Sequence, residues 1–170
     1  LEKQRSVVDT WPAGGLVEGW VTLIGHDLAS DRLFAEAAEL ARAAGTSLTF
    51  HMSPSPDDGL AFAQRSGKRP INHLADLGVL GPETLIAHAV YLDDGELDLL
   101  INTRTAISYC PWAYLRLGQG VSVSGRHLEF HQRKGRLALG CDTENAGDSI
   151  DALRVGALAA GLARDMSCNP

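Results

Sequence analysis

The chain has 170 residues with 15 basic and 21 acidic side chains, which gives a net charge of −6. The basic residues are scattered, so the positive patch that binds phosphate backbones is missing and we expect no nucleic-acid partner. No run of eighteen apolar residues occurs, so we expect no membrane span or membrane partner. The amino-terminal residues lack a signal-peptide pattern, which favours a cytoplasmic location. The cysteines, which lack C-x-x-C spacing and are expected to be reduced thiols, are Cys110, Cys141 and Cys168.

The first predicted unit is a loop, a strand and a helix. Residues 1–19 include a proline and paired glycines, which break helical and extended periods, so a loop is expected there. The apolar, β-branched run at residues 19–24 predicts a strand. Ser30 is a suitable N-cap for a helix whose apolar residues recur from Leu33 to Ala44, and Gly45 ends the pattern.

Four similar units follow along the chain. Strands are predicted at residues 47–51, 84–89, 105–110 and 136–142, and helix-like segments at residues 58–65, 71–77, 94–102 and 126–134, with a final helix that Asp148 caps. The alternation of strands and helices predicts a parallel sheet in an α/β protein. The pattern contains five strands, whereas a closed (β/α) barrel has eight.

Three side chains that could bind a metal or transfer protons stand at the carboxyl ends of predicted strands. They are His51, His88 and Asp142, and a turn and a helix-like segment follow each of them. In parallel α/β architectures the residues that close the strands project into the site built by the following loops. A catalytic zinc or iron centre uses imidazoles and carboxylates from rigid positions and keeps one coordination place open for water. The pattern therefore predicts hydrolytic metal chemistry.

These residues also have structural interpretations. An isolated histidine at a strand end can bond a backbone carbonyl or pack in the core, and Asp142 can cap a turn or the following helix. His26, after the first predicted strand, is a candidate to face the pocket, but a turn residue is the preferred interpretation. His73, His127 and His131 lie in helix-like, polar segments, where we expect them to be exposed to solvent.

Four sequence blocks carry a resemblance to a known family. They are Leu48-Thr-Phe-His51, Leu80-Gly-Pro-Glu-Thr-Leu-Ile-Ala-His-Ala-Val-Tyr-Leu92, Ser108-Tyr-Cys-Pro-Trp-Ala-Tyr-Leu-Arg-Leu-Gly-Gln-Gly120 and Leu137-Ala-Leu-Gly-Cys-Asp142. In these blocks, their order and their separations, the chain resembles the amidohydrolase superfamily and, within it, the cytosine deaminase-like and chlorohydrolase-like branch. The resemblance covers nearly the whole chain. It implies a partial (β/α)8 TIM barrel that contains the family's strands four to eight.

The resemblance also implies roles for the three strand-end residues. His51 would be a metal ligand, Asp142 would both contact the metal and act as the base for the hydrolytic water, and His88 would orient the substrate or the hydroxide. Members of this branch bind one divalent metal ion, zinc or iron. They use water to remove amino, alkylamino or halide groups from ring carbons, or to open cyclic amides. The implied partner is a small-molecule substrate.

Two departures from the family concern the metal and the proton transfer. The family's first strand supplies a His-x-His pair that is missing here, so these ligands are expected to precede Leu1. We therefore interpret residues 1–170 as a single catalytic-barrel segment that binds metal weakly and is inactive in isolation. Deaminases of the family have a proton-transferring glutamate three residues after the fifth-strand histidine, and Pro54 stands at that position here. The carboxylates left as alternatives for this role are Asp57, Asp58 and Glu144.

A third departure lies in the seventh-strand block. The family usually has Cys-Pro-x-Ser-Asn, and this chain has Cys110-Pro-Trp-Ala-Tyr114. Trp112 and Tyr114 are larger and more apolar than the residues they replace, and they are candidates to line the substrate pocket, because aromatic walls favour aromatic or apolar ligands. Packing of both side chains against the barrel rim is the alternative.

The preferred interpretation is a metal-dependent hydrolase that breaks carbon–nitrogen bonds other than peptide bonds, or carbon–halogen bonds, of a small and perhaps heterocyclic compound. One alternative is a non-catalytic relative whose barrel binds a ligand or partner. Another is a complete flavodoxin-like protein, for which five strands suffice but which the missing glycine-rich phosphate turn disfavours. Because an unclosed sheet exposes its edges, the missing barrel half or a homo-oligomer is the expected macromolecular partner.

Overall fold

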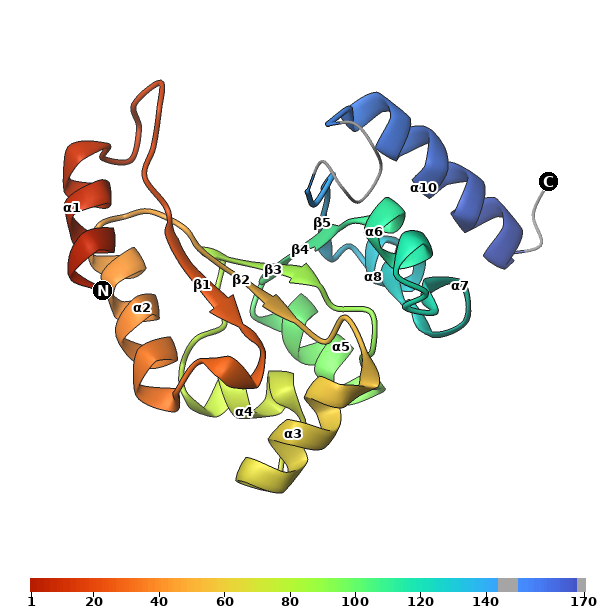
Figure 1. Ribbon diagram of the computed structural model, residues 1–170, viewed down its shortest axis with the longest axis horizontal. Coiled ribbons are helices and arrows are strands. Elements are labelled where there is room, and N and C mark those ends of the chain that lie inside the picture. Colours follow the sequence, from red (N-terminus) through yellow and green to blue (C-terminus); the bar gives the residue numbers. More distant parts are fainter. Residues whose placement is uncertain (144–149, 168–170) are drawn as a thin grey trace.

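The computed structural model describes residues 1–143 and 150–167. Its centre is one sheet of five parallel strands, which are β1 (Val21–Gly25), β2 (Leu48–Met52), β3 (Thr84–His88), β4 (Ala106–Tyr109) and β5 (Arg136–Leu139). Figure 1 shows the strands side by side in chain order. Each strand therefore pairs with the one that follows it in the sequence.

This strand order decides between the two α/β architectures. In a doubly wound sheet the strand order reverses at a switch point, and no reversal occurs in the described residues, so the flavodoxin-like alternative is wrong. A run of adjacent parallel strands, each joined to the next through helices, forms the wall of a (β/α) barrel. In the described part of the chain β1 and β5 are the two edges of the sheet, so the barrel wall is partial.

Helices separate the strands. They include α2 (Asp31–Ala43), α3 (Pro56–Ser66), α4 (Pro70–Asp76), α5 (Asp94–Asn102), α8 (His127–Gln132) and α10 (Ala152–Ser167). Two caps follow from the sequence: Ser30 accepts the Leu33 N–H at the start of α2, as predicted, and Asp93 and Glu96 form a capping box at the start of α5. These local hydrogen bonds fix where the two helices begin. Within the described residues no helix is long and apolar enough to cross a bilayer.

Several boundaries differ from the sequence predictions. Within the loop expected at residues 1–19, α1 (Glu2–Thr10) is helical and contributes Val8 to the core. The segments between these helices also contain η1 (His26–Leu28), α6 (Pro111–Arg116) and α7 (Val121–Ser124). β5 ends at Leu139, three residues before the expected end at Asp142. Asp148, the predicted cap of the last helix, lies outside the described residues.

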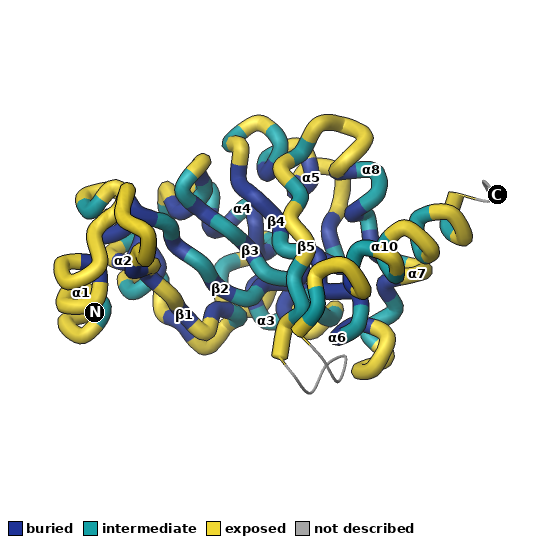
Figure 2. The backbone as a smooth tube through the Cα atoms, turned by 90° about the horizontal axis from the view of Figure 1, so that it is seen from above, coloured by how far each residue is buried: buried dark blue, intermediate teal, exposed yellow. Residues whose placement is uncertain are grey.

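The two faces of the sheet differ in burial. In β2 and β3 buried residues alternate with half-buried ones. Figure 1 places α2, α4 and α5 along one side of the sheet, and the fully buried side chains of Phe34, Phe50, Ile86 and Leu97 belong to the main core cluster. Figure 2 shows exposed positions alternating with buried ones in β1 and exposed positions along most of β5, whereas β2 and β3 have none. The half-buried positions of β2 include His51, so the less covered face carries a predicted site residue.

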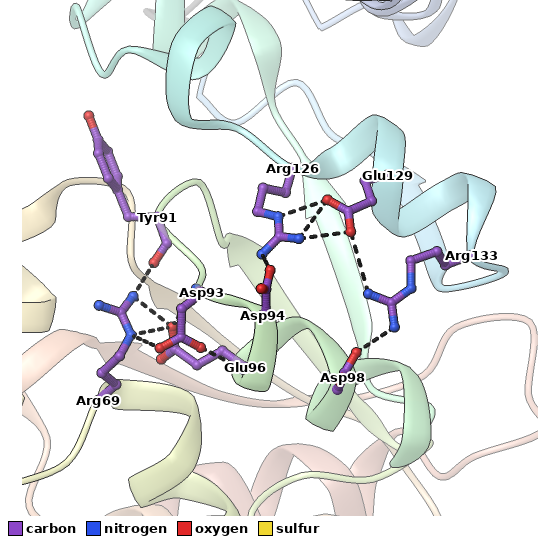
Figure 3. A network of polar contacts seen from close by, with 9 residues as sticks. All are labelled: Arg69, Tyr91, Asp93, Asp94, Glu96, Asp98, Arg126, Glu129 and Arg133. Carbon is purple, nitrogen blue, oxygen red and sulfur yellow. Dashed lines mark hydrogen bonds and ion pairs between the residues drawn. The ribbon is translucent and has the colours of Figure 1, made fainter.

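Ion pairs fasten the segment that follows β3 to a neighbouring helix (Figure 3). Glu96 is fully buried, and its carboxylate accepts hydrogen bonds from Arg69 at 2.8 Å and from the Ile71 N–H at 3.0 Å. Arg69 also donates to the Tyr91 carbonyl at 3.0 Å and pairs with Asp93 at 2.8 Å. These contacts hold the loop between β3 and α5 against the start of α4.

A second group of ion pairs in Figure 3 joins α5 to α8. Arg126 pairs with Asp94 at 2.7 Å and with Glu129 at 2.7 Å. Arg133 pairs with Glu129 and with Asp98. These pairs therefore connect the helix that follows β3 to the helix that precedes β5.

Candidate active site

Three imidazoles meet at the carboxyl ends of the first three strands. His26 follows β1, whereas His51 and His88 lie at the ends of β2 and β3. The rings of His26 and His51 stack with centroids 5.6 Å apart, and those of His51 and His88 stack at 5.2 Å. The structure therefore brings His51 and His88 together, and it adds His26, for which a turn role was preferred over a position facing the pocket.

His51 is oriented by the strand beside it. Its Nδ1 donates to the Ile24 carbonyl at 2.7 Å, so in the unprotonated ring the lone pair lies on Nε2. A hydrogen bond of this kind fixes the tautomer of metal-binding histidines. Gly25 permits the close approach of the two strands, because a Cβ there would lie 2.1 Å from the His51 carbonyl oxygen. His51 could thus bind a metal ion through Nε2.

His88 is buried and has a strained backbone. Its φ is 81° and that of Ala89 is 51°, left-handed values that residues with a Cβ rarely adopt. Burial, followed by the charge of the neighbouring His51, lowers the pKa of the His88 imidazole to about 4, so this ring is neutral at physiological pH. Its buried Nδ1 has no hydrogen-bond partner within the described residues. A neutral ring with an unsatisfied nitrogen can contact a substrate or a water molecule.

Asp142 lies beyond the end of β5 and is exposed, with a φ of 60°. Its negative charge acts on His88, where it opposes the lowering of the imidazole pKa, so the two side chains face the same region. In residues 1–143 and 150–167, no three His, Cys, Asp or Glu side chains gather closely enough to hold a metal ion. The imidazole of His51 and the carboxylate of Asp142 are donor types that suit zinc or iron, but a catalytic site requires further ligands.

The turn after β2 places a carboxylate close to Pro54. Asp58 is buried, and its Oδ2 accepts hydrogen bonds from His26 Nδ1 at 2.8 Å and from a backbone N–H of the turn at 2.6 Å. Among the alternatives to the family's glutamate, Asp58 therefore contacts the imidazole cluster. Asp57 is exposed at the start of α3, and Glu144 lies outside the described residues.

The two aromatic residues predicted to line a pocket have different surroundings. Trp112 is half-buried in α6, whereas Tyr114 is fully buried. The Tyr114 hydroxyl accepts the Cys110 N–H at 2.8 Å, and its ring lies edge-on to His88 with centroids 5.6 Å apart. These contacts favour the packing alternative for Tyr114. The pocket role of Trp112 stays a prediction.

Two histidines that we expected to be exposed are buried. His73 is 9% exposed and bonds Asp31 at 2.9 Å, and His127 is 4% exposed and donates from Nε2 to the His88 carbonyl at 2.6 Å. Burial lowers the pKa of His127 to about 4. Helix α8 has six residues, which is too short for a hydrophobic period to indicate its buried face. The sequence therefore carries no signal that separates His127 from His131, which is exposed as predicted.

Comparison with known proteins identifies the family. A sequence model described as the amidohydrolase family matches residues 2–169. The chain belongs to the amidohydrolase family. This amidohydrolase chain is 31% identical over 174 residues to a 5'-deoxyadenosine deaminase of Methanosarcina mazei, a match that covers 100% of the chain and 39% of the relative. It is 30% identical over 129 residues to a 5'-deoxyadenosine deaminase of Methanopyrus kandleri, covering 76% of the chain and 30% of the relative.

Two solved structures share the fold of this amidohydrolase chain. An adenosine deaminase from Xanthomonas campestris with bound zinc superposes with a TM-score of 0.89 at 19% identity, over 99% of this chain and 38% of that one. An atrazine chlorohydrolase from Arthrobacter aurescens complexed with zinc superposes with a TM-score of 0.89 at 20% identity, over 99% and 37%. The predicted fold class is confirmed. The chain spans less than two fifths of the length of these four proteins.

Proposed function

We propose that this chain is the carboxyl-terminal barrel segment of a metal-dependent hydrolase. The enzyme uses water to break a carbon–nitrogen bond other than a peptide bond, or a carbon–halogen bond, in a small heterocyclic compound. The observation that carries the proposal is the stacked pair of His51 and His88 at the ends of adjacent parallel strands, with rings 5.2 Å apart. Strand ends of this kind form the active sites of (β/α) barrels. The deaminases and the chlorohydrolase among the relatives and structural neighbours support the bond types.

We propose that His51 and Asp142 hold one divalent ion, zinc or iron, together with ligands from the part of the barrel that this chain does not contain. Nε2 of His51 carries the lone pair that faces away from the Ile24 carbonyl, and a carboxylate completes a donor set that such ions accept. The zinc named with two structural neighbours supports this assignment. When bound, the ion supplies Lewis acidity and lowers the pKa of water to ~7.

The chain's own residues orient the substrate and move protons. Asp142, exposed beyond β5, takes the proton of the attacking water as general base. His88 contacts the substrate or the water with a ring that burial keeps uncharged at neutral pH. Trp112 lines the pocket, and Tyr114 supports the wall from behind through its contact with His88.

The test uses the complete enzyme, which is the polypeptide that contains this chain and the rest of the barrel. Metal content is measured by mass spectrometry, and release of ammonia or chloride is measured with 5'-deoxyadenosine, related nucleosides and chlorotriazines. We expect about one divalent ion per chain, loss of metal in His51→Ala, and a fall in kcat of at least about 100-fold in Asp142→Asn. Glu39→Gln, on the exposed surface of α2, is the control that leaves both readouts unchanged. A protein without a stoichiometric divalent ion contradicts the proposal.

A non-catalytic barrel is the second candidate, because Pro54 stands where deaminases of the family have their proton-transferring glutamate. Pro54→Glu restores a carboxylate at this position in the complete protein, and Pro56→Glu adds the same charge two residues later on the exposed start of α3. A hydrolase is expected to gain at least about tenfold in deamination from Pro54→Glu only, since proton transfer by a placed side chain contributes about 100-fold or more. If neither the wild-type protein nor Pro54→Glu hydrolyses any substrate while calorimetry detects ligand binding, the binding function is favoured.

A further inference from the structure

The backbone at His88 adopts a conformation that its neighbours must enforce. His88 and Ala89 both have positive φ values, of 81° and 51°. Such strained residues persist only where surrounding contacts over-determine them, and they cluster at functional sites. In the register of β2 and β3, His88 lies beside Met52, whereas Ala87 lies beside His51. The stacking of His88 on His51 therefore depends on how the chain turns at the end of β3.

The His88 carbonyl at this turn is held from a distant part of the chain. His127 Nε2 donates to it at 2.6 Å across 39 residues of sequence. The Tyr114 hydroxyl also faces this carbonyl, at 3.5 Å. The donors come from α8 and α6, which follow β4, so the strain in β3 is stabilised by the next strand-helix unit.

The His127 ring is itself fixed in place. It is 4% exposed and stacks on Tyr109 with centroids 4.2 Å apart, and Tyr109 lies at the end of β4. A backbone carbonyl only accepts hydrogen bonds, so Nε2 of His127 carries the proton. Its Nδ1 is buried and has no partner in the part of the chain that the structure describes. The ring therefore makes one directed polar contact, and that contact is with His88.

We propose that His127 is a positioning residue for His88, which clamps the left-handed turn of His88 so that its imidazole stays stacked on His51 and directed at the substrate. Tyr114 supports the same carbonyl. This inference rests on the proposed function, in which His88 contacts the substrate or the attacking water. His127 acts through His88 and touches no reacting atom.

The test compares four variants of the complete enzyme. His127→Leu removes the donor, His127→Gln keeps an amide N–H near the place of Nε2, and His127→Asn has an amide that is one methylene too short. His131→Leu, four residues later on α8, is the control for an added leucine on the same helix. We expect kcat to fall by about 100-fold in His127→Leu and His127→Asn, since small misplacements of a reacting group have effects of this size. His127→Gln stays within about fivefold of wild type, and His131→Leu is unchanged.

A double-mutant cycle separates positioning from general destabilisation. If His127 acts through His88, adding His127→Leu to His88→Ala lowers kcat/KM by less than about twofold, because the two changes are not additive. A second full loss in the His88→Ala background overturns the proposal, and so does wild-type activity in His127→Asn. Where His127→Leu does not fold, the Gln and Asn variants decide the matter. Activity in the wild-type enzyme with no effect at position 127 overturns the positioning role alone, whereas an inactive, metal-free wild-type enzyme overturns the proposed function as well.

Discussion

At the scale of single residues, the buried imidazole of His127 is expected to make the stability of the protein depend on pH. Its ring is packed against Tyr109 and Tyr114 and faces the carbonyl of His88, and burial lowers its pKa from 6.5 to about 4. Below pH 6.5 the His127 imidazole is protonated in the unfolded chain, whereas in the folded chain it stays neutral down to about pH 4. Stability therefore falls as the pH drops from 6.5 to 4, and this group adds no further change below pH 4. At ~1.4 kcal/mol per pKa unit the loss is about 3 kcal/mol.

Urea denaturation of the complete protein at several pH values measures this effect, with His127→Gln as the control that cannot titrate. Between pH 6.5 and 5 the wild-type protein is expected to lose about 2 kcal/mol more stability than the variant. His88, whose pKa is also lowered to about 4, is present in both proteins and cancels in the comparison. Parallel pH profiles for the two proteins contradict the prediction.

At the scale of elements, the close approach of β1 and β2 depends on one glycine. Gly25 has a φ of 80° and a ψ of −145°, and a Cβ there would meet the His51 carbonyl oxygen at 2.1 Å. Gly25→Ala is therefore expected to destabilise the protein by about 3 kcal/mol or more, from backbone strain and the clash. Gly45→Ala is the matched control, because Gly45 has a φ of 63° but open space around its Cα, and it costs about 1–2 kcal/mol.

Thermal or urea unfolding gives the two stabilities, and metal content gives a second readout for Gly25→Ala. Displacement of the His51 backbone is expected to lower metal affinity in this variant and to leave it unchanged in Gly45→Ala. Equal losses of stability in Gly25→Ala and Gly45→Ala would contradict the prediction, because β1 and β2 would then accommodate the added Cβ without a further loss of stability.

The ion pairs around α5 give a second prediction at this scale. Glu96 is fully buried, so Glu96→Ala leaves the N–H groups of Ile71 and Asp93 without this acceptor, whereas Arg69 keeps Asp93 and the Tyr91 carbonyl as partners. We expect a loss of about 2–4 kcal/mol of stability, because each backbone N–H left without an acceptor costs about 1–3 kcal/mol. Asp98→Ala removes an ion pair with Arg133 whose two side chains are both more than 40% exposed, and it is expected to change stability far less, because solvent screens exposed ion pairs. Urea denaturation compares the two, and similar losses contradict the prediction.

The helices and strands that the sequence predicted well are those whose ends are set by residues close in the sequence. Helix α5 runs from Asp94 to Asn102 as predicted, and its start is set locally by the capping box of Asp93 and Glu96. The strand ends at His51 and His88 were within one residue, since apolar runs and turns mark them. Helix α1 escaped prediction because a tertiary contact holds it: Gln4 bonds both backbone groups of Thr22 in β1.

The candidate site was predictable in part for the same reason. The rule that parallel strands end at one edge brings His51 and His88 together without further information. Burial of His127 and the hydrogen bond that it donates to His88 depend on how α8 packs, and a six-residue helix has no period that shows this. The left-handed turn at His88 was likewise unpredictable, because histidine adopts a positive φ more often than most residues but still in a small minority of cases.

At the scale of the whole molecule, the two edges of the sheet differ in protection. The side-chain amide of Gln4 bonds the N–H and carbonyl of Thr22, so it occupies the hydrogen-bonding edge of β1 as a neighbouring strand would. In β5, three of four residues are exposed, and Leu139 is 46% exposed. Unpaired strand edges with apolar side chains recruit other chains. The 170-residue chain by itself is therefore expected to associate mainly through β5.

Sedimentation of the isolated chain over a range of concentrations tests this prediction. Leu139→Lys places a charge on the β5 edge and is expected to shift the distribution toward monomer, since lysine at an edge opposes strand pairing. Leu60→Lys adds the same charge on α3, where Leu60 is 62% exposed, and should have no effect. Gln4→Ala uncovers the β1 edge and should increase association. The prediction is wrong if the wild-type chain stays monomeric at all concentrations. It is also wrong if the two lysine substitutions have equal effects, because β5 is then not the edge through which the chain associates. Association that disappears when the remaining barrel strands are co-expressed would identify them as the segment that pairs with β5.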